Sequence, residues 1–153
     1  SEHTGSRYRE TVETTKDVLA NIKNYFPGYE GQGVELAGIF WHQGWNDGCN
    51  KEFTAEYEKN MIHFVNDIRK DLSNEGLPFI IATSGMGGRG GVVRPHQIAA
   101  AKKIDRCTAV DTQGFLKHKV GRQISHWHNS ADAYTRLGDA SGKAMIGILE
   151  GKK

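Results

Sequence analysis

The chain has 153 residues, of which 25% are charged, and its formal net charge is +2. This length fits one domain with a core of its own, and the composition is that of a globular protein and not a disordered one. The small net charge, with no basic stripe, excludes nucleic acid as an expected partner. No apolar run approaches the roughly 18 residues that cross a membrane, so no membrane partner is expected either.

The first half of the sequence predicts two helices with one strand between them. Apolar residues recur at helical spacing over residues 7–25, and Pro27-Gly28 ends this helix. Residues 34–41 are apolar almost throughout, which is typical of a strand that is covered on both faces. After a polar loop, a second helix is predicted over residues 53–72, with Thr54 as its candidate cap.

The second half continues the alternation of strands and helices. Its predicted elements are a strand at 77–83, a glycine-rich loop at 84–91, a helix at 95–103, a strand at 107–111, a polar segment to residue 129 and a helix at 131–149. This order predicts an α/β fold, a parallel sheet with helices on both sides. Three strands are fewer than the five or so that are usual, so we expect an incomplete domain.

Cys49 and Cys107 are the two cysteines of the sequence. The first follows one predicted strand and the second begins another, which places them at opposite ends of a parallel sheet. That separation is too large for a disulfide, so we expect free thiols.

Three loops follow the carboxyl ends of the predicted strands, where ligands bind in open parallel sheets. In the first loop, Gly44 and Asn46 offer a backbone N–H and a side-chain amide, with Trp41 and Trp45 to exclude water. Two such donors suit an oxygen on which negative charge develops. The alternative is a tight turn, in which glycine permits the bend and Asn46 bonds to its own loop.

The last loop contributes His126 and His128. Either histidine suits a general base, because its side chain titrates near neutral pH. A metal site is disfavoured because further ligands are missing, and no cofactor is expected. In the loop 84–94, which includes the glycine-rich part, we expect Arg89 or Arg94 to contact ligand, whereas Ser84 lacks the Gly-x-Ser-x-Gly context of a nucleophile.

Two motifs resemble those of the SGNH hydrolases. The segment Gly44-Trp45-Asn46-Asp47 is similar to their third block, Gly-x-Asn-Asp, and ELAGIFWHQGWND resembles the sialate O-acetylesterase and acetylxylan esterase branch. His126-Trp127, followed by NSADAYTRLGDASGKAM, resembles the final block with its catalytic histidine. The resemblance implies a flavodoxin-like three-layer α/β/α sandwich, and it implies hydrolysis of acetyl esters on carbohydrates.

The resemblance also implies roles for particular residues. Gly44 would supply a backbone N–H and Asn46 its amide to an oxyanion hole, while His126, or else His128, would be the base that activates a serine. We favour His126 from the His-Trp match, and the spacing to Tyr134 favours His128. Further residues expected to bind substrate are Gln43, Trp45, Asp47 and Arg89.

The sequence departs from the pattern of the resembling family in two respects. Many members of that family have an aspartate three positions before the histidine, whereas these positions are Gln123 and Ser125 here, so the orienting acid is Asp111 or Asp132, or a serine–histidine dyad acts alone. The first block, Gly-Gln-Ser-Asn with its serine nucleophile, and the second block are absent. We therefore expect the chain to be the C-terminal part of one esterase domain. Its partners would be an acetylated carbohydrate and an N-terminal segment or companion chain that carries the serine and pairs with the bare edge of strand 34–41.

Two other functions fit the same residues. A non-catalytic carbohydrate-binding or assembly module would stack Trp41, Trp45 and Trp127 on sugar rings. A metal hydrolase would be built on the two histidines. Since sugar polymers are met mostly outside the cytoplasm, a secreted or periplasmic location is expected by analogy.

Overall fold

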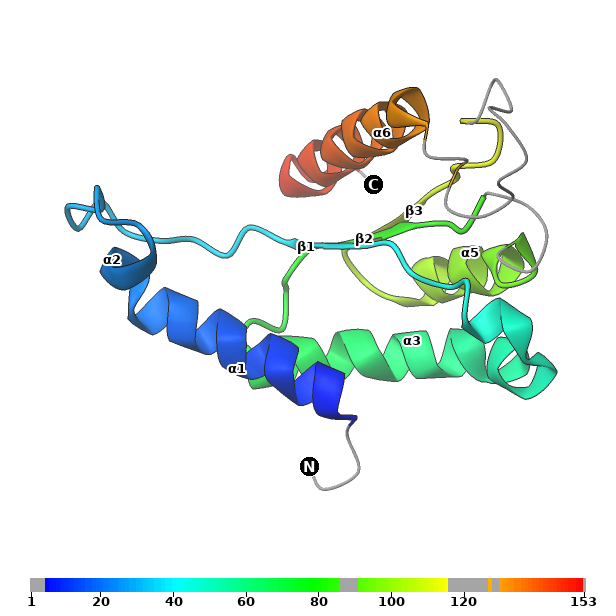
Figure 1. Ribbon diagram of the computed structural model, residues 1–153, viewed down its shortest axis with the longest axis horizontal. Coiled ribbons are helices and arrows are strands. Elements are labelled where there is room, and N and C mark those ends of the chain that lie inside the picture. Colours follow the sequence, from blue (N-terminus) through cyan, green and yellow to red (C-terminus); the bar gives the residue numbers. More distant parts are fainter. Residues whose placement is uncertain (1–4, 86–90, 116–126, 128–129, 153) are drawn as a thin grey trace.

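The chain is seen in a computed structural model, which describes residues 5–85, 91–115, 127 and 130–152 (Figure 1). The helices are α1 (Ser6–Ala20), α2 (Ile22–Tyr25), α3 (Lys51–Asp71), α5 (Arg94–Lys103) and α6 (Ala131–Leu149), with a short 3-10 helix η1 (Asp47–Cys49). The strands are β1 (Ile39–Trp41), β2 (Phe79–Ala82) and β3 (Cys107–Val110).

The strands form a parallel sheet in the order β1-β2-β3. In this register Ile39 pairs with Phe79, which in turn pairs with Cys107. Every residue of the central strand β2 is buried. Within the described residues, the other edge of β1 has no partner strand.

Helices cover both faces of the sheet. In Figure 1, α6 lies on one side of the strands while α3 and α5 lie on the other side. Helix α1 lies against α3, where Tyr8 donates a hydrogen bond of 2.6 Å to Asp71 and packs edge-on against Phe64. The predicted α/β class, with three layers and an incomplete sheet, is confirmed.

Alternation along the strands divides the core between the two faces. Phe79 and Ile81 of β2 join the larger cluster with α3 and α5, and Ile80 points to the α6 side. Gly38, just before β1, allows the close approach of α6, since a Cβ atom there would lie 2.5 Å from the Met145 Cε atom. The loops that follow the strands at the carboxyl edge are therefore anchored to a sheet that is packed on both faces.

Helix α6 has the predicted bounds of 131–149, whereas three predictions in the first half need correction. The helix predicted over 7–25 is broken at Asn21 into α1 and α2. The predicted strand 34–41 is regular only at 39–41, because β2 pairs with those residues alone; Phe40, with 47% of its surface exposed, lies on a face left partly open. The cap of α3 is Asn50 and not Thr54: the Asn50 side chain accepts from the backbone N–H groups of Glu52 and Phe53.

Both cysteines are free thiols, as predicted, with Cys49 exposed and Cys107 buried. Within the described residues, no helix combines the length and the apolar composition that crossing a membrane requires. The same part of the chain contains no cluster of three or more histidine, cysteine, aspartate or glutamate side chains that could hold a metal ion.

Candidate active site

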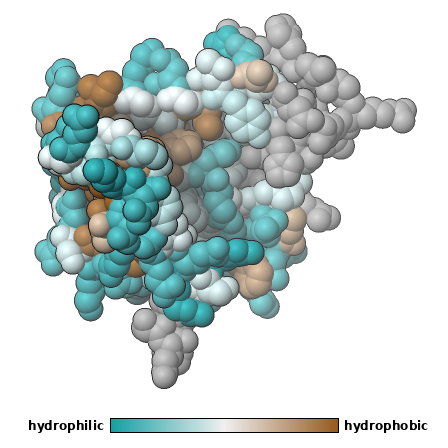
Figure 2. All heavy atoms as spheres, turned by 60° about the vertical axis from the view of Figure 1, so that its left-hand side comes forward, coloured by the Kyte–Doolittle hydropathy of each residue, from teal (hydrophilic) through white to brown (hydrophobic). Residues whose placement is uncertain are grey.

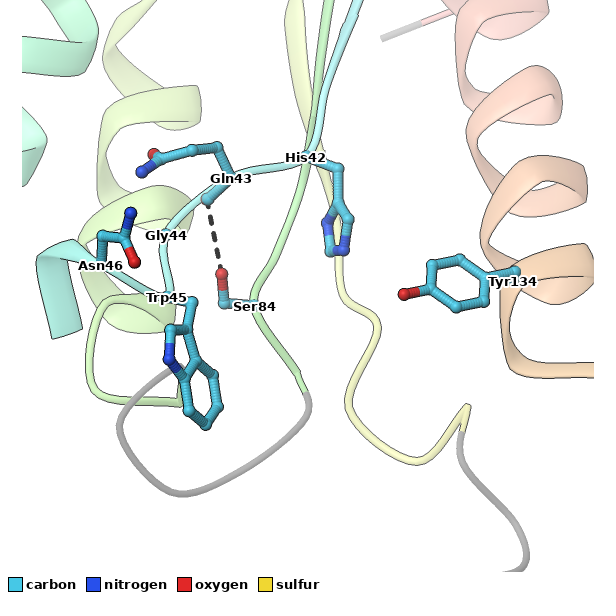
Figure 3. Close-up of a pocket in the computed structure, with 7 residues that line it drawn as sticks. All are labelled: His42, Gln43, Gly44, Trp45, Asn46, Ser84 and Tyr134. Atoms are coloured by element: carbon cyan, nitrogen blue, oxygen red, sulfur yellow. Dashed lines mark hydrogen bonds between the residues drawn. The ribbon is translucent and has the colours of Figure 1, made fainter. Parts of the chain in front are cut away.

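A pocket of about 420 Å³ opens at the carboxyl ends of β1 and β2, as the fold rule for parallel sheets predicts (Figure 3). The loop after β1 forms one wall, the end of β2 forms the floor, and the start of α6 faces them. The lining residues are His42, Gln43, Gly44, Trp45, Asn46, Ser84 and Tyr134. Among the described residues, the side chains of this lining are polar or aromatic.

The wall after β1 is held by the backbone carbonyl of Gln43. This oxygen accepts hydrogen bonds from Gln97 Nε2 at 2.7 Å, from the Tyr57 hydroxyl at 3.0 Å and, at the longer distance of 3.4 Å, from Ser84 Oγ (Figure 3). The Gln43 side chain turns away to donate to Asp47 Oδ2 at 2.5 Å. Gln43 and Asp47, two of the residues predicted to bind substrate, are therefore hydrogen-bonded to each other within the loop.

Gly44 is buried at the tightest point of the loop. A Cβ atom there would lie 2.4 Å from Ser84 Oγ and 2.7 Å from Val93 Cγ2, distances that real Cβ atoms essentially never show. Glycine is therefore required for close packing of the loop on β2 and α5, a reason that the sequence pattern alone did not supply.

Asn46 lies on the exposed side of the same wall. Its backbone carbonyl accepts from the N–H of Cys49 at 3.1 Å in η1. In the part of the chain that the structure describes, its side-chain amide makes no hydrogen bond. Among the described residues, the geometry therefore does not show the alternative in which Asn46 serves its own loop through that amide.

His42 is a pocket residue that the sequence analysis missed. Its Nδ1 atom lies 3.2 Å from the carbonyl oxygen of Ala82, which can only accept, so Nδ1 carries the proton. The other nitrogen, Nε2, then accepts from the indole N–H of Trp127 at 3.4 Å. The signal in the sequence was its place, directly after a buried strand and at the same sheet edge as Gly44.

Three predicted site residues, His126, His128 and Arg89, lie outside the described residues. Trp127, between the two histidines in sequence, is described: 2% of its surface is exposed and it packs against His42, with 6.3 Å between ring centroids. This contact brings position 127 of the last loop next to the loop after β1.

The two candidate orienting acids are both engaged in ion pairs. Arg94 contacts both carboxylate oxygens of Asp111, with 2.8 Å between Nε and Oδ1. The Arg94 guanidinium holds the pKa of the Asp111 carboxyl below its ordinary value. Asp132 pairs with Arg136 at 2.8 Å on α6. Arg94, which we expected from the sequence to contact ligand, is thus paired with Asp111 in the structure.

Of the three tryptophans considered for sugar stacking, only Trp45 lines the pocket. Trp41 packs into the core against Phe64, with 4.6 Å between ring centroids, and Trp127 is buried. Trp41 and Trp127 do not line the pocket, so the structure does not bring the three tryptophans together into one platform there.

The sequence model of the family described as carbohydrate esterase, sialic acid-specific acetylesterase, matches residues 2–147. The chain belongs to this family, which confirms the resemblance carried by the Gly44–Asp47 segment. No match is found among curated proteins.

A solved structure of a protein from Arabidopsis thaliana is similar in fold, with a TM-score of 0.72 and 22% sequence identity. The alignment covers 95% of this chain and 54% of that protein. The chain therefore spans about half the length of this structural relative.

Proposed function

We propose that this chain is one part of an O-acetylesterase that removes acetyl groups from carbohydrates. The observation that carries the proposal is the pairing of Gly44 and Asn46 on one pocket at the carboxyl ends of β1 and β2, with the Asn46 amide unbonded among the described residues. Membership of the carbohydrate esterase family supports the same reaction. The polar and aromatic lining suits a sugar, whose faces are apolar and whose edges carry hydroxyl groups.

In the proposed reaction, a serine on a companion segment attacks the acetyl carbonyl carbon. His126 or His128 takes the proton of the serine hydroxyl, and the carbonyl oxygen becomes an oxyanion that the Gly44 N–H and the Asn46 amide stabilise. The C–O bond to the sugar then breaks and the histidine returns the proton to the sugar oxygen. Water, activated by the same histidine, releases acetate from the serine and restores its hydroxyl group.

The open edge of β1 is the proposed place for the companion segment. Next to it lies an apolar hollow of about 320 Å³, lined by Phe40, Ile80, Leu137, Gly138, Ser141, Gly142 and Met145. Large apolar side chains are exposed at several places on the chain, and Figure 2 shows apolar residues reaching the surface among hydrophilic ones. An extended apolar strand fits this edge, because it would satisfy the free backbone groups of β1 and cover Phe40.

The test is hydrolysis of 4-nitrophenyl acetate and of an O-acetylated sugar by four samples: the isolated chain, the chain with the proposed serine-bearing segment, and the Ser84→Ala variant of each. We expect turnover only when this segment is present, and no effect of Ser84→Ala on the chemistry. Robust turnover by the isolated chain that Ser84→Ala abolishes would overturn the proposal. Glycan binding without hydrolysis in the full-length protein would instead favour a binding module.

The identity of the base is tested in the same full-length protein. His126→Ala and His128→Ala are compared, and the sequence match favours the larger loss of kcat for His126→Ala. A secreted or periplasmic location is also proposed, and cell fractionation followed by esterase assay checks it.

A further inference from the structure

Gln97 is a fully buried polar side chain that links three elements of the fold. It extends from α5 and contacts the end of β2, the loop after β1 and helix α3. Its Oε1 atom accepts from the Ser84 backbone N–H at 2.8 Å, and its Nε2 atom donates to the Gln43 carbonyl at 2.7 Å and to the Tyr57 hydroxyl at 3.2 Å. A buried amide with all of these bonds has a fixed position.

The orientation of the Gln97 amide is determined by its backbone partners. The Ser84 N–H can only donate and the Gln43 carbonyl can only accept, so Oε1 and Nε2 cannot exchange places. Burial raises the pKa of the Tyr57 hydroxyl, which therefore keeps its proton and donates it to the same Gln43 carbonyl. Gln97 thus supports this carbonyl twice, directly and by orienting the Tyr57 hydroxyl.

The bonds to the Gln43 carbonyl fix the direction of the next N–H group. The peptide bond between Gln43 and Gly44 is planar and trans, so the carbonyl and the Gly44 N–H point to opposite sides. When Gln97 and Tyr57 hold the carbonyl towards α5 and α3, the Gly44 N–H faces away from these helices. If the carbonyl is released, rotation of this peptide turns the N–H as well.

We propose that Gln97 is a positioning residue that orients the Gly44 N–H for the oxyanion of the acetyl-transfer step. The inference rests on the proposed esterase function and extends it to a side chain outside the motif after β1. Gln97 does not need to touch the substrate, because it acts through the Gln43–Gly44 peptide.

The sharpest variant is Gln97→Glu, which has nearly the same shape. In its ionised form it keeps an acceptor for the Ser84 N–H but replaces the donor to Gln43 with a second acceptor, so the carbonyl is repelled; the kinetics and spectra are therefore recorded over a range of pH. In the full-length esterase we expect kcat to fall by about 10²-fold with KM nearly unchanged, since a misplacement of about 1 Å costs this much. Gln32→Glu, the same chemical change in an exposed loop, is the control and leaves kcat unaltered.

A second readout does not depend on activity. Labelling glutamine at the carbonyl carbon with ¹³C and glycine with ¹⁵N selects the amide signals of Gln–Gly pairs, of which this chain has three: Gln32-Gly33, Gln43-Gly44 and Gln113-Gly114. In Gln97→Glu we expect the Gly44 signal to shift while those of Gly33 and Gly114 stay in place. The spectra are recorded for the labelled chain alone and with its unlabelled companion segment.

The two readouts separate the possible failures. An unmoved Gly44 signal together with unchanged kcat would overturn the positioning role. A shifted Gly44 signal in a protein that hydrolyses no acetyl ester would support the positioning role and refute the proposed function. If Gln97→Glu does not fold, Gln97→Met, which is similar in length and uncharged, is subjected to the same two measurements.

Discussion

Asn46→Ala separates a role in catalysis from a role in the fold. Asn46 is exposed and its amide has no partner among the described residues, while its backbone bond to Cys49 is retained by alanine. The free energy of unfolding should therefore change by no more than about 0.5 kcal/mol, as for other surface positions. Loss of one oxyanion donor should lower kcat by about 10² to 10³, or about 2.7–4 kcal/mol of transition-state stabilisation.

The assay pairs acetyl-ester kinetics of the full-length protein with urea denaturation of the same samples. Asn60→Ala, at an exposed position of α3, is the matched control and should leave kcat unchanged. A kcat within a factor of about 3 of the parent would refute the reasoning, as would a rate loss accompanied by an equal fraction of unfolded protein.

Two further predictions concern stability. In Gly44→Ala the new Cβ would lie 2.4 Å from Ser84 Oγ. Overpacking of this kind costs about 1–3 kcal/mol, and at about 2–4 °C per kcal/mol we expect Tm to fall by about 2–12 °C in calorimetry. Gly28→Ala is the control and should not share this loss, because no heavy atom of the described residues lies within 4 Å of the added Cβ. Because Arg94 lowers the pKa of Asp111, the pair stabilises the fold above the ordinary carboxyl pKa and loses this effect as the pH falls through the lowered value. Asp111→Asn should therefore be less stable than the parent at pH 7 and converge with it in acid, and a constant difference across the pH range of urea titrations would contradict this.

Elements with strong periodicity or clear end signals could be predicted from the sequence. Helix α6 has the predicted bounds, and its Ser130 cap accepts from the Ala133 N–H. The buried strand at Phe79–Ala82 was also recognised from its apolar run. In both cases the local pattern and the tertiary packing favour the same structure, so local reasoning suffices.

The length of β1 could not be predicted in this way. Residues 34–38 have the apolar composition of a strand, but regular pairing requires a neighbour, and β2 pairs only with 39–41. Composition describes what a segment can form, whereas the partner strand decides how much of it forms.

The residues of the candidate site likewise include some that a local pattern predicts and others that it does not. The Gly44 and Asn46 positions were found because a motif at the end of a buried strand lies at a known place in parallel sheets. His42 and Gln97 were missed, since their roles depend on contacts with Ala82, Trp127 and Gln43 that are distant in sequence. No local pattern around a lone histidine or glutamine reports such contacts.

The central claim is that this chain holds the oxyanion donors and the base of an acetylesterase whose serine lies on another segment. The most direct measurement is acetate release from an O-acetylated sugar by the chain before and after addition of the proposed serine-bearing segment. The account predicts no release by the chain alone, release by the mixture, and loss of that release in Asn46→Ala. Equal release with and without the added segment would contradict it.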